Sequence, residues 1–207
     1  MNFLHTLVKS FLAFVVVIFT MAFTADTGSK KAATEWNIDK AHSKISFTVS
    51  HFFTPVTGQF QEYTSDIQFD PNNLEESRVN VEIMVNSIDT DNQKRDGHLR
   101  SDDFFHAQKF PNITFRSNEI VQTGENTFAA RGALTIKDVT RDVELPFTLL
   151  GIRDHPMRDG VQLAGIKLDY TLDRNTYNVG VGDWVSDAVV GDEVDITATL
   201  ELNSANS

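Results

Sequence analysis

The stretch SIDTDNQKRDGHLRSDDFF, from Ser87 to Phe105, is crowded with charge and separates two long runs in which apolar and polar residues alternate. Asp89 or Thr90 can cap a helix inside it, because short polar side chains accept hydrogen bonds from the first free backbone amides of a helix. Gly97 weakens that helix by roughly 1 kcal/mol relative to alanine. We therefore expect a short helix that closes one side of a β structure.

One face of the expected helix combines ionisable and apolar side chains. At spacings of three and four residues this face carries Arg95, His98, Leu99 and Asp102. Arg95, Asp96 and His98 are candidates for a polar group at the mouth of a cavity, while Phe104 and Phe105 return to an apolar interior. The alternative is a surface charge network that pins the helix to a strand end, and the residue types favour this alternative.

From Trp36 onward the remaining sequence alternates in the manner of half-buried β-strands. The expected strands lie within residues 44–51, 60–69, 78–86, 113–117, 128–136, 143–149, 161–169 and 194–202. Eight such strands with short connections close most simply into an antiparallel barrel, because closure removes exposed strand edges. A β-sandwich buries the same alternating positions and stays open as an alternative.

Phenylalanine dominates the aromatic residues, with 16 Phe against 3 Tyr and 2 Trp. The phenylalanines expected on buried strand faces are Phe47, Phe60, Phe69, Phe115, Phe128 and Phe147. Such a set fits either of two interpretations, an aromatic core that packs solidly or an elongated apolar cavity for a lipid chain. Ligand cavities are mostly apolar with few polar groups, which is compatible with the second interpretation.

The formal net charge of −11 argues against nucleic acid as a partner, because phosphate binding requires clustered Lys and Arg. It also disfavours adsorption to anionic lipid surfaces. The chain has no cysteine, so it has no disulfides and no lipid-modified cysteine. A domain without disulfides must be stabilised by its core alone.

The N-terminus has the pattern of a signal peptide, which we assign to residues 1–25. Lys9 precedes an apolar run, Phe11–Phe23, that is shorter than the roughly 20 residues of a membrane span. Cleavage is expected after Ala25, with Ala22 and Ala33 as alternatives, and an uncleaved anchor stays open. Residues 26–35 are expected to be a tether, 36–203 the barrel and 204–207 a tail. This pattern predicts export to a periplasm.

No arrangement of residues in the sequence indicates catalysis or a metal site. There is no cysteine, no G-x-S-x-G motif and no paired histidines at metal-ligand spacing. Asp96 and His98 could support acid–base chemistry in principle. We therefore predict no catalytic residue, no metal and no cofactor other than a bound lipid, and we keep an enzyme with His98 as base and Asp96 orienting it as an alternative.

Several sequence blocks, taken in order, resemble the YceI-like family of periplasmic lipid-binding proteins. The blocks are IDKAHSKISFTVSH at 38–51, GQF at 58–60, SIDT at 87–90, RDGHLRSDDFF at 95–105, FPNITFRS at 110–117 and GALTIKDVT at 132–140. The resemblance covers residues 36–202. The segment LDRNTYNVG at 172–180 fits a family pattern only loosely.

The resemblance implies an eight-stranded antiparallel barrel of lipocalin-like shape, with a helix closing part of it. It also implies a long pocket for a polyisoprenoid, a quinone tail or a fatty chain, no catalysis, and in several members a link to stress. The predicted ligand-binding residues are Phe47, His51, Phe60, Phe69, Val81, Ile83, Arg95, Asp96, His98, Leu99, Phe104, Phe105, Phe115, Leu134 and Phe147.

The sequence thus predicts a non-enzymatic barrel that sequesters or transports one long apolar chain. Its expected partner is an apolar lipid, and transient contact with a membrane or membrane protein during lipid exchange is left open, as is a homodimer. The alternatives are an enzyme acting on a lipid or quinone at the cavity mouth, and a packed structural or interaction barrel.

Overall fold

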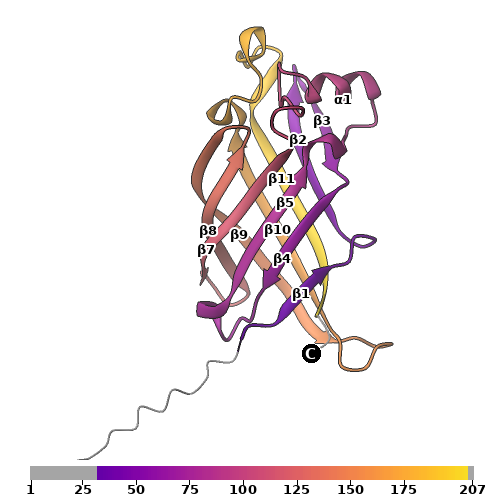
Figure 1. Ribbon diagram of the computed structural model, residues 1–207, viewed down its shortest axis with the longest axis vertical. Helices are drawn as coiled ribbons and strands as arrows, with labels where there is room; N and C mark the ends of the chain where they lie inside the picture. Colours follow the sequence, from indigo (N-terminus) through magenta and orange to yellow (C-terminus); the bar gives the residue numbers. More distant parts are fainter. Residues whose placement is uncertain (1–31, 205–207) are drawn as a thin grey trace, which may run out of the picture. The chain divides into compact units, whose positions relative to one another are not determined.

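The computed structural model describes residues 32–204, which form an antiparallel β-barrel with one short α-helix beside it (Figure 1). The predicted signal peptide, most of the predicted tether and residues 205–207 lie outside the described residues. Within residues 32–204 no helix has the length and apolar character needed to cross a membrane.

The described chain is built almost entirely from strands. The strands are β1 (Glu35–Ile38), β2 (Lys44–His51), β3 (Thr54–Phe60), β4 (Tyr63–Gln68), β5 (Arg78–Met84), β6 (Ile88–Asp89), β7 (Asn112–Gln122), β8 (Thr127–Ile136), β9 (Val139–Asp154), β10 (Gln162–Asp173) and β11 (Val190–Ser204). The helix α1 spans Gln93–Arg100, and short 3₁₀ turns lie at Leu74–Glu76, Val85–Ser87, Arg174–Tyr177 and Gly182–Trp184.

The eleven strands form a closed barrel with eight strand positions in its wall. Three of these positions are each occupied by two successive shorter strands. β1 and β2 both pair with β11, and β1 also pairs with β4, which closes the ring. The closing pairs place Trp36 opposite both Ser204 and Ile67. The predicted eight-stranded antiparallel barrel is therefore confirmed, and the sandwich alternative is wrong.

The barrel wall has a seam between β6 and β7, which the helix segment covers. β5 pairs with β7, whereas β6 pairs only with β3. The guanidinium of Arg100, at the end of α1, donates to the carbonyl oxygens of Asn86 (3.1 Å) and Ile88 (2.6 Å). The helix segment thus supplies donors to the strand edge that β7 leaves open, which confirms that a short helix closes one side.

The cap of α1 differs from the one expected. Asn92 is the N-cap, and its side chain accepts a hydrogen bond from the Arg95 amide at 3.0 Å. Asp89 still belongs to β6, and Asp91 has a positive φ of 59° that turns the chain before the helix begins. The predicted caps Asp89 and Thr90 are therefore wrong, because the turn after β6 delays the helix.

A packed aromatic group fills the barrel end that carries β1 and Ser204, here called the terminal end. The rings of Phe69, Phe128 and Phe147 lie 5.3–5.6 Å apart in pairs, and Phe128 stacks on Phe147. The Trp36 indole donates to the Phe69 carbonyl at 2.8 Å. Aromatic pairs of this kind contribute about 0.5–1.5 kcal/mol beyond area burial.

The ordered barrel extends slightly beyond the predicted boundaries of 36–203. Ala33 is buried, the Phe69 amide donates to the Thr34 carbonyl at 2.8 Å, and β1 begins at Glu35. At the other terminus β11 ends at Ser204. The last residues of the expected tether are thus part of the barrel.

Candidate functional site

An apolar cavity with a volume of about 200 Å³ lies inside the barrel. Its wall is made of Ile45, Ser46, Phe47, Phe60, Ile67, Phe69, Val79, Val81, Ile83, Ile113, Phe115, Ala130, Leu134, Ile136, Leu145, Phe147, Ile166, Leu168, Tyr170, Leu172, Ile196, Ala198, Leu200 and Leu202. Only Ser46 and Tyr170 in this wall carry a polar side-chain atom, and burial raises the pKa of the Tyr170 phenol. The cavity can therefore hold an apolar molecule but offers almost no polar anchor.

The cavity is long and narrow. Alternate residues from Ile196 to Leu202 on β11 all line it, which corresponds to about 20 Å of strand. Cavities of about 150 Å³ bind benzene, whereas pockets for drug-sized ligands span about 300–1,000 Å³. A volume of about 200 Å³ spread over such a length suits a slender chain rather than a compact ring system.

Eight of the fifteen predicted ligand-binding residues lie in this wall. They are Phe47, Phe60, Phe69, Val81, Ile83, Phe115, Leu134 and Phe147. All eight come from alternating positions, so the period-two pattern located them. The wall residues of β10 and β11 were missed, although the same alternation marks Ile166, Leu168 and Leu200. Ligand contact at all of these positions stays a prediction.

Two phenylalanines of the cavity wall lie on the strands that border the helix end. We define the helix end by α1, the β2–β3 hairpin and residues 174–189. The Phe47 and Phe60 rings lie 5.7 Å apart on neighbouring strands. Phe47 lies opposite Gly58, and a Cβ at Gly58 would overlap the Phe47 ring. Glycine at this position therefore makes the room in which the Phe47 ring lies against its neighbouring strand.

Three further predicted residues, Leu99, Phe104 and Phe105, are absent from the cavity wall and cover the helix end instead. Phe105 packs edge-on against Phe60 with ring centroids 6.2 Å apart. Phe104 is buried and lies 5.5 Å from the Trp184 ring, which belongs to the loop before β11. We call this group of three aromatic residues and one leucine the aromatic cover. It consists of Leu99, Phe104, Phe105 and Trp184.

The predicted polar group is mostly occupied by contacts within the helix segment. The buried carboxylate of Asp96 accepts hydrogen bonds from the amide (2.9 Å) and hydroxyl (2.5 Å) of Thr90. Arg95 donates to the Thr90 hydroxyl (2.8 Å) and carbonyl (2.7 Å). These bonds tie α1 to the end of β6, as the charge-network interpretation expects.

Two predicted histidines lie near the surface of the helix end. His98 Nε2 is 2.8 Å from an Asp103 carboxylate oxygen, so Asp103 rather than Asp96 orients this imidazole. That detail of the enzyme alternative is wrong, because Asp96 faces Thr90. His51 is exposed at the end of β2, beside the Phe52 ring. Neither histidine lines the cavity.

Sequence reasoning missed Arg174, the residue that organises the loop beyond β10. Its guanidinium is 3% exposed and donates to the carbonyl oxygens of Val179 (2.9 Å), Val190 (2.8 Å) and Gly191 (2.8 Å). Burial lowers its pKa, while the negative charge of Asp192 acts in the opposite direction. The available signal for this role in the sequence was an arginine just after a strand in which apolar and polar residues alternate.

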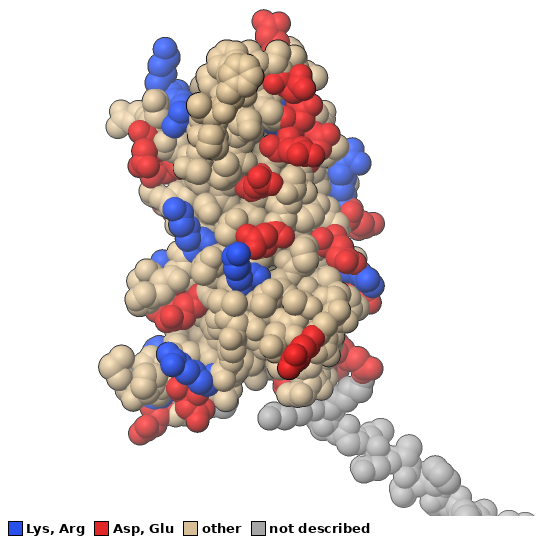
Figure 2. All heavy atoms as spheres, turned by 180° about the vertical axis from the view of Figure 1, so that it is seen from behind, with Lys and Arg blue, Asp and Glu red and all other residues tan. Residues whose placement is uncertain are grey.

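Charge on the outer surface is mixed. On the face shown in Figure 2, acidic side chains are interspersed with scattered Lys and Arg rather than gathered opposite a basic stripe. The ion pairs of Arg131 with Glu119 (3.1 Å) and Glu144 (2.6 Å) are half-exposed examples. This face therefore shows no basic patch of the kind that binds phosphate groups.

A closed antiparallel barrel around an apolar cavity defines the class of lipocalin-like binding barrels. The chain belongs to the YceI-like family, since the model of the YceI-like domain matches residues 36–202. Protein YceI from Salmonella arizonae is 33% identical over 164 residues, which cover 78% of this chain and 84% of that relative. The resemblance expected from the sequence blocks is confirmed.

Solved structures share this barrel. BcnA from Burkholderia cenocepacia has a TM-score of 0.72 and 28% identity, over 80% of this chain and 99% of that one. A polyisoprenoid binding domain from Saccharophagus degradans has a TM-score of 0.60 and 14% identity, over 84% of this chain and 100% of that domain. At this identity the second likeness concerns the fold alone.

Proposed function

We propose that this protein binds one slender apolar chain, a polyisoprenoid, an isoprenoid quinone tail or a fatty chain, and carries or sequesters it without chemical change. The observation that carries the proposal is the continuous apolar wall of the cavity, in which only Ser46 and Tyr170 bear polar side-chain atoms. The name of the Saccharophagus domain, which shares this fold, refers to the same class of ligand.

Binding of this kind needs no polar anchor inside the barrel. Each methylene transferred from water contributes about 0.8 kcal/mol, so a chain of modest length binds firmly through burial alone. A polar head group then stays at the helix end, where the exposed His51 and the half-exposed His98–Asp103 pair lie. In this arrangement the cavity sets affinity and the helix end sets head-group preference.

The proposal is tested by filling the cavity with an added side chain. Ala198 lines the cavity, whereas the next residue on β11, Thr199, is exposed on the outside. We expect Ala198→Phe to abolish uptake of geranylgeraniol and palmitate, and Thr199→Phe to leave uptake unchanged, as measured by native mass spectrometry. Thermal unfolding of both variants checks that each still folds.

Equal uptake by folded Ala198→Phe and wild type would contradict the proposal. A wild type that is recovered without lipid and takes up neither probe would make the barrel a packed structural domain. Lipid extraction from protein purified from its own cells identifies the natural ligand. Turnover of that lipid, lost in His98→Ala, would instead support the enzyme alternative.

We also propose that the protein works in a periplasm and touches a membrane briefly during lipid exchange. The leader pattern of residues 1–25 supports the location. Phe52 and Phe53 support the contact, because they lie at the tip of the β2–β3 hairpin and are 57% and 100% exposed. Aromatic side chains favour the membrane–water interface, and these two lie at the same end as the aromatic cover.

Replacing both tip residues tests this contact. Phe52→Ser combined with Phe53→Ser is expected to slow transfer of a fluorescent fatty acid from phosphatidylcholine vesicles by about tenfold, because it removes two interfacial side chains of large apolar area. Equilibrium uptake of the same probe from detergent should not change. Unchanged transfer rates would exclude this hairpin as the contact site.

A further inference from the structure

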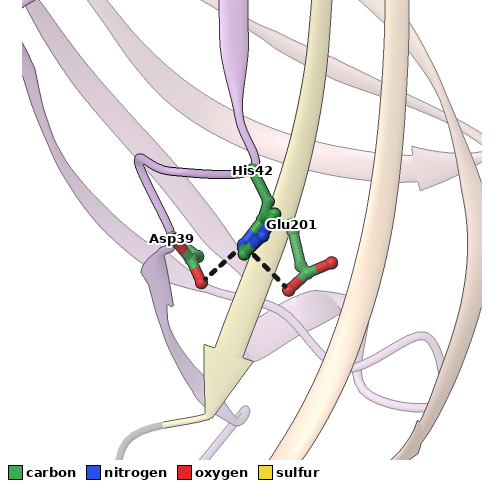
Figure 3. A group of neighbouring side chains, drawn as sticks. All are labelled: Asp39, His42 and Glu201. Atoms are coloured by element: carbon green, nitrogen blue, oxygen red, sulfur yellow. Dashed lines mark hydrogen bonds and ion pairs between the residues drawn. The ribbon is translucent and has the colours of Figure 1, made fainter.

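A second group of ionisable side chains lies outside the barrel, far in sequence from the helix segment. Asp39 and His42 belong to the turn between β1 and β2, and Glu201 belongs to β11 (Figure 3). Leu200 and Leu202 line the cavity, so the alternation of β11 directs Glu201 to the outer surface. This group is therefore separate from the proposed lipid site.

The three side chains face one another. His42 Nδ1 lies 3.1 Å from an Asp39 carboxylate oxygen and 3.8 Å from a Glu201 carboxylate oxygen. One potential ligand atom from each residue lies within 4.8 Å of the other two. Zinc bonds to nitrogen and oxygen are about 2.1 Å long, so ligand atoms around one zinc ion lie at most about 4.2 Å apart. Small rotations of exposed side chains therefore bring all three into a coordination shell.

Backbone contacts hold this group together without using the carboxylate of Glu201. The Asp39 amide donates to the Glu201 carbonyl at 2.8 Å, and the Glu201 amide donates to the Ser43 hydroxyl at 3.0 Å. A second Asp39 oxygen accepts from the Ala41 amide at 2.9 Å, which fixes the turn. The ligand residues are thus positioned before any ion arrives, which reduces the entropic cost of binding.

The electrostatics of the group favour a cation. The carboxylates of Asp39 and Glu201 place negative charge beside the His42 imidazole. The same negative charge attracts a metal ion, which replaces the proton on the imidazole when it binds. His42 and Glu201 also line a hollow of about 410 Å³ on the outer surface, so the position is open to solutes.

We propose that Asp39, His42 and Glu201 form a binding site for a divalent transition-metal ion on the outer wall of the barrel. One imidazole with two carboxylates suits zinc, cobalt, nickel or manganese, whereas magnesium and calcium prefer oxygen ligands alone. The ion joins the turn after the first strand to the last strand. It therefore acts as a clamp across the pairing that closes the barrel, and solvent completes its coordination.

The test is a zinc titration of untagged, EDTA-stripped protein by isothermal titration calorimetry, with magnesium as the control ion. We expect one zinc ion per chain. Glu201→Gln and His42→Ala should each weaken binding at least about tenfold, since both remove a direct ligand of the metal. Glu193→Gln is the matched control, because Glu193 is an exposed glutamate on the same strand with no histidine pair among the described residues.

A second readout distinguishes this site from other histidines. Zinc should raise the melting temperature of the wild type and of Glu193→Gln, because an ion that binds only the folded state stabilises it. At the same zinc concentration it should raise that of Glu201→Gln less. In EDTA all three should melt alike, since the backbone contacts of Glu201 remain. Absence of zinc binding by the wild type, or zinc binding by Glu201→Gln and His42→Ala that is as tight as that of the wild type, would overturn the proposal.

Discussion

The two ends of the barrel use phenylalanine in opposite ways. At the terminal end Phe69 and Phe128 are 2% and 1% exposed and lie in three-way ring contact with Phe147. At the helix end Phe60 and Phe105 are only partly buried, and Phe105 comes from a segment outside the barrel wall. One end is filled by the strands themselves, whereas the other is covered by separate pieces of chain.

This difference explains where a ligand can enter. The strands at the terminal end pair without interruption around the ring, so opening that end would break backbone hydrogen bonds. At the helix end β6 has no partner in β7, and the aromatic cover rests on side-chain contacts. Side-chain contacts reorganise without unfolding the sheet, so we expect ligand exchange at the helix end.

The largest loss of folding stability should come from a substitution at the terminal end. Phe128→Ala removes a 1% exposed ring from the aromatic group and is expected to lower the free energy of unfolding by about 3–5 kcal/mol. The measurement is chemical denaturation with guanidinium chloride. A loss below about 1 kcal/mol would mean that the terminal end relaxes around the deletion, and the contrast between the ends would fail.

An intermediate effect is expected from the loop that borders the helix end. Arg174→Met removes the donors to Val179, Val190 and Gly191 and should cost about 3 kcal/mol, because bonds from a buried charged donor are strong. Arg131→Ala is the control, since its ion pairs are half-exposed and contribute at most about 1 kcal/mol. Equal losses in both variants would show that Arg174 is not the organiser of this loop.

The smallest effect on stability should come from the cover itself. Phe105→Ala is expected to cost only about 1–2 kcal/mol, because the ring is partly buried. The same variant should accelerate uptake of a fluorescent fatty acid in stopped-flow measurements, since the cover opens more easily. Faster uptake in Phe128→Ala but not in Phe105→Ala would place ligand exchange at the terminal end and reverse the comparison.

Local sequence pattern predicted most of the strands and eight residues of the cavity wall. The alternation of Val79, Val81 and Ile83 directs one face inward whatever the partner strand is, so the cavity wall could be anticipated. The same pattern does not say which strands close the ring or where the chain turns before a helix. Asn92 as N-cap and Arg174 as a loop organiser depend on such turns, and both were missed.

The group at Asp39, His42 and Glu201 shows this limit most clearly. Asp39 and His42 are three residues apart and could be paired from sequence. Glu201 lies about 160 residues away and reaches them only because β11 pairs with both β1 and β2, as in the Ser43–Glu201 contact with a separation of 158 residues. Arg95 and Asp96 bond to the nearby Thr90, as the favoured charge-network interpretation expects, and their contact with a ligand head group stays a prediction.

The pairing of β11 with β1 and β2 also dictates when the protein can fold. The strands that begin the barrel have no partner on one side until the last residues of the domain, Val190–Ser204, have been made. Contacts this distant in sequence form slowly, because a long loop must close before they contribute. We expect the nascent chain to stay open until β11 has been synthesised, so that a chain without this strand forms no stable closed barrel.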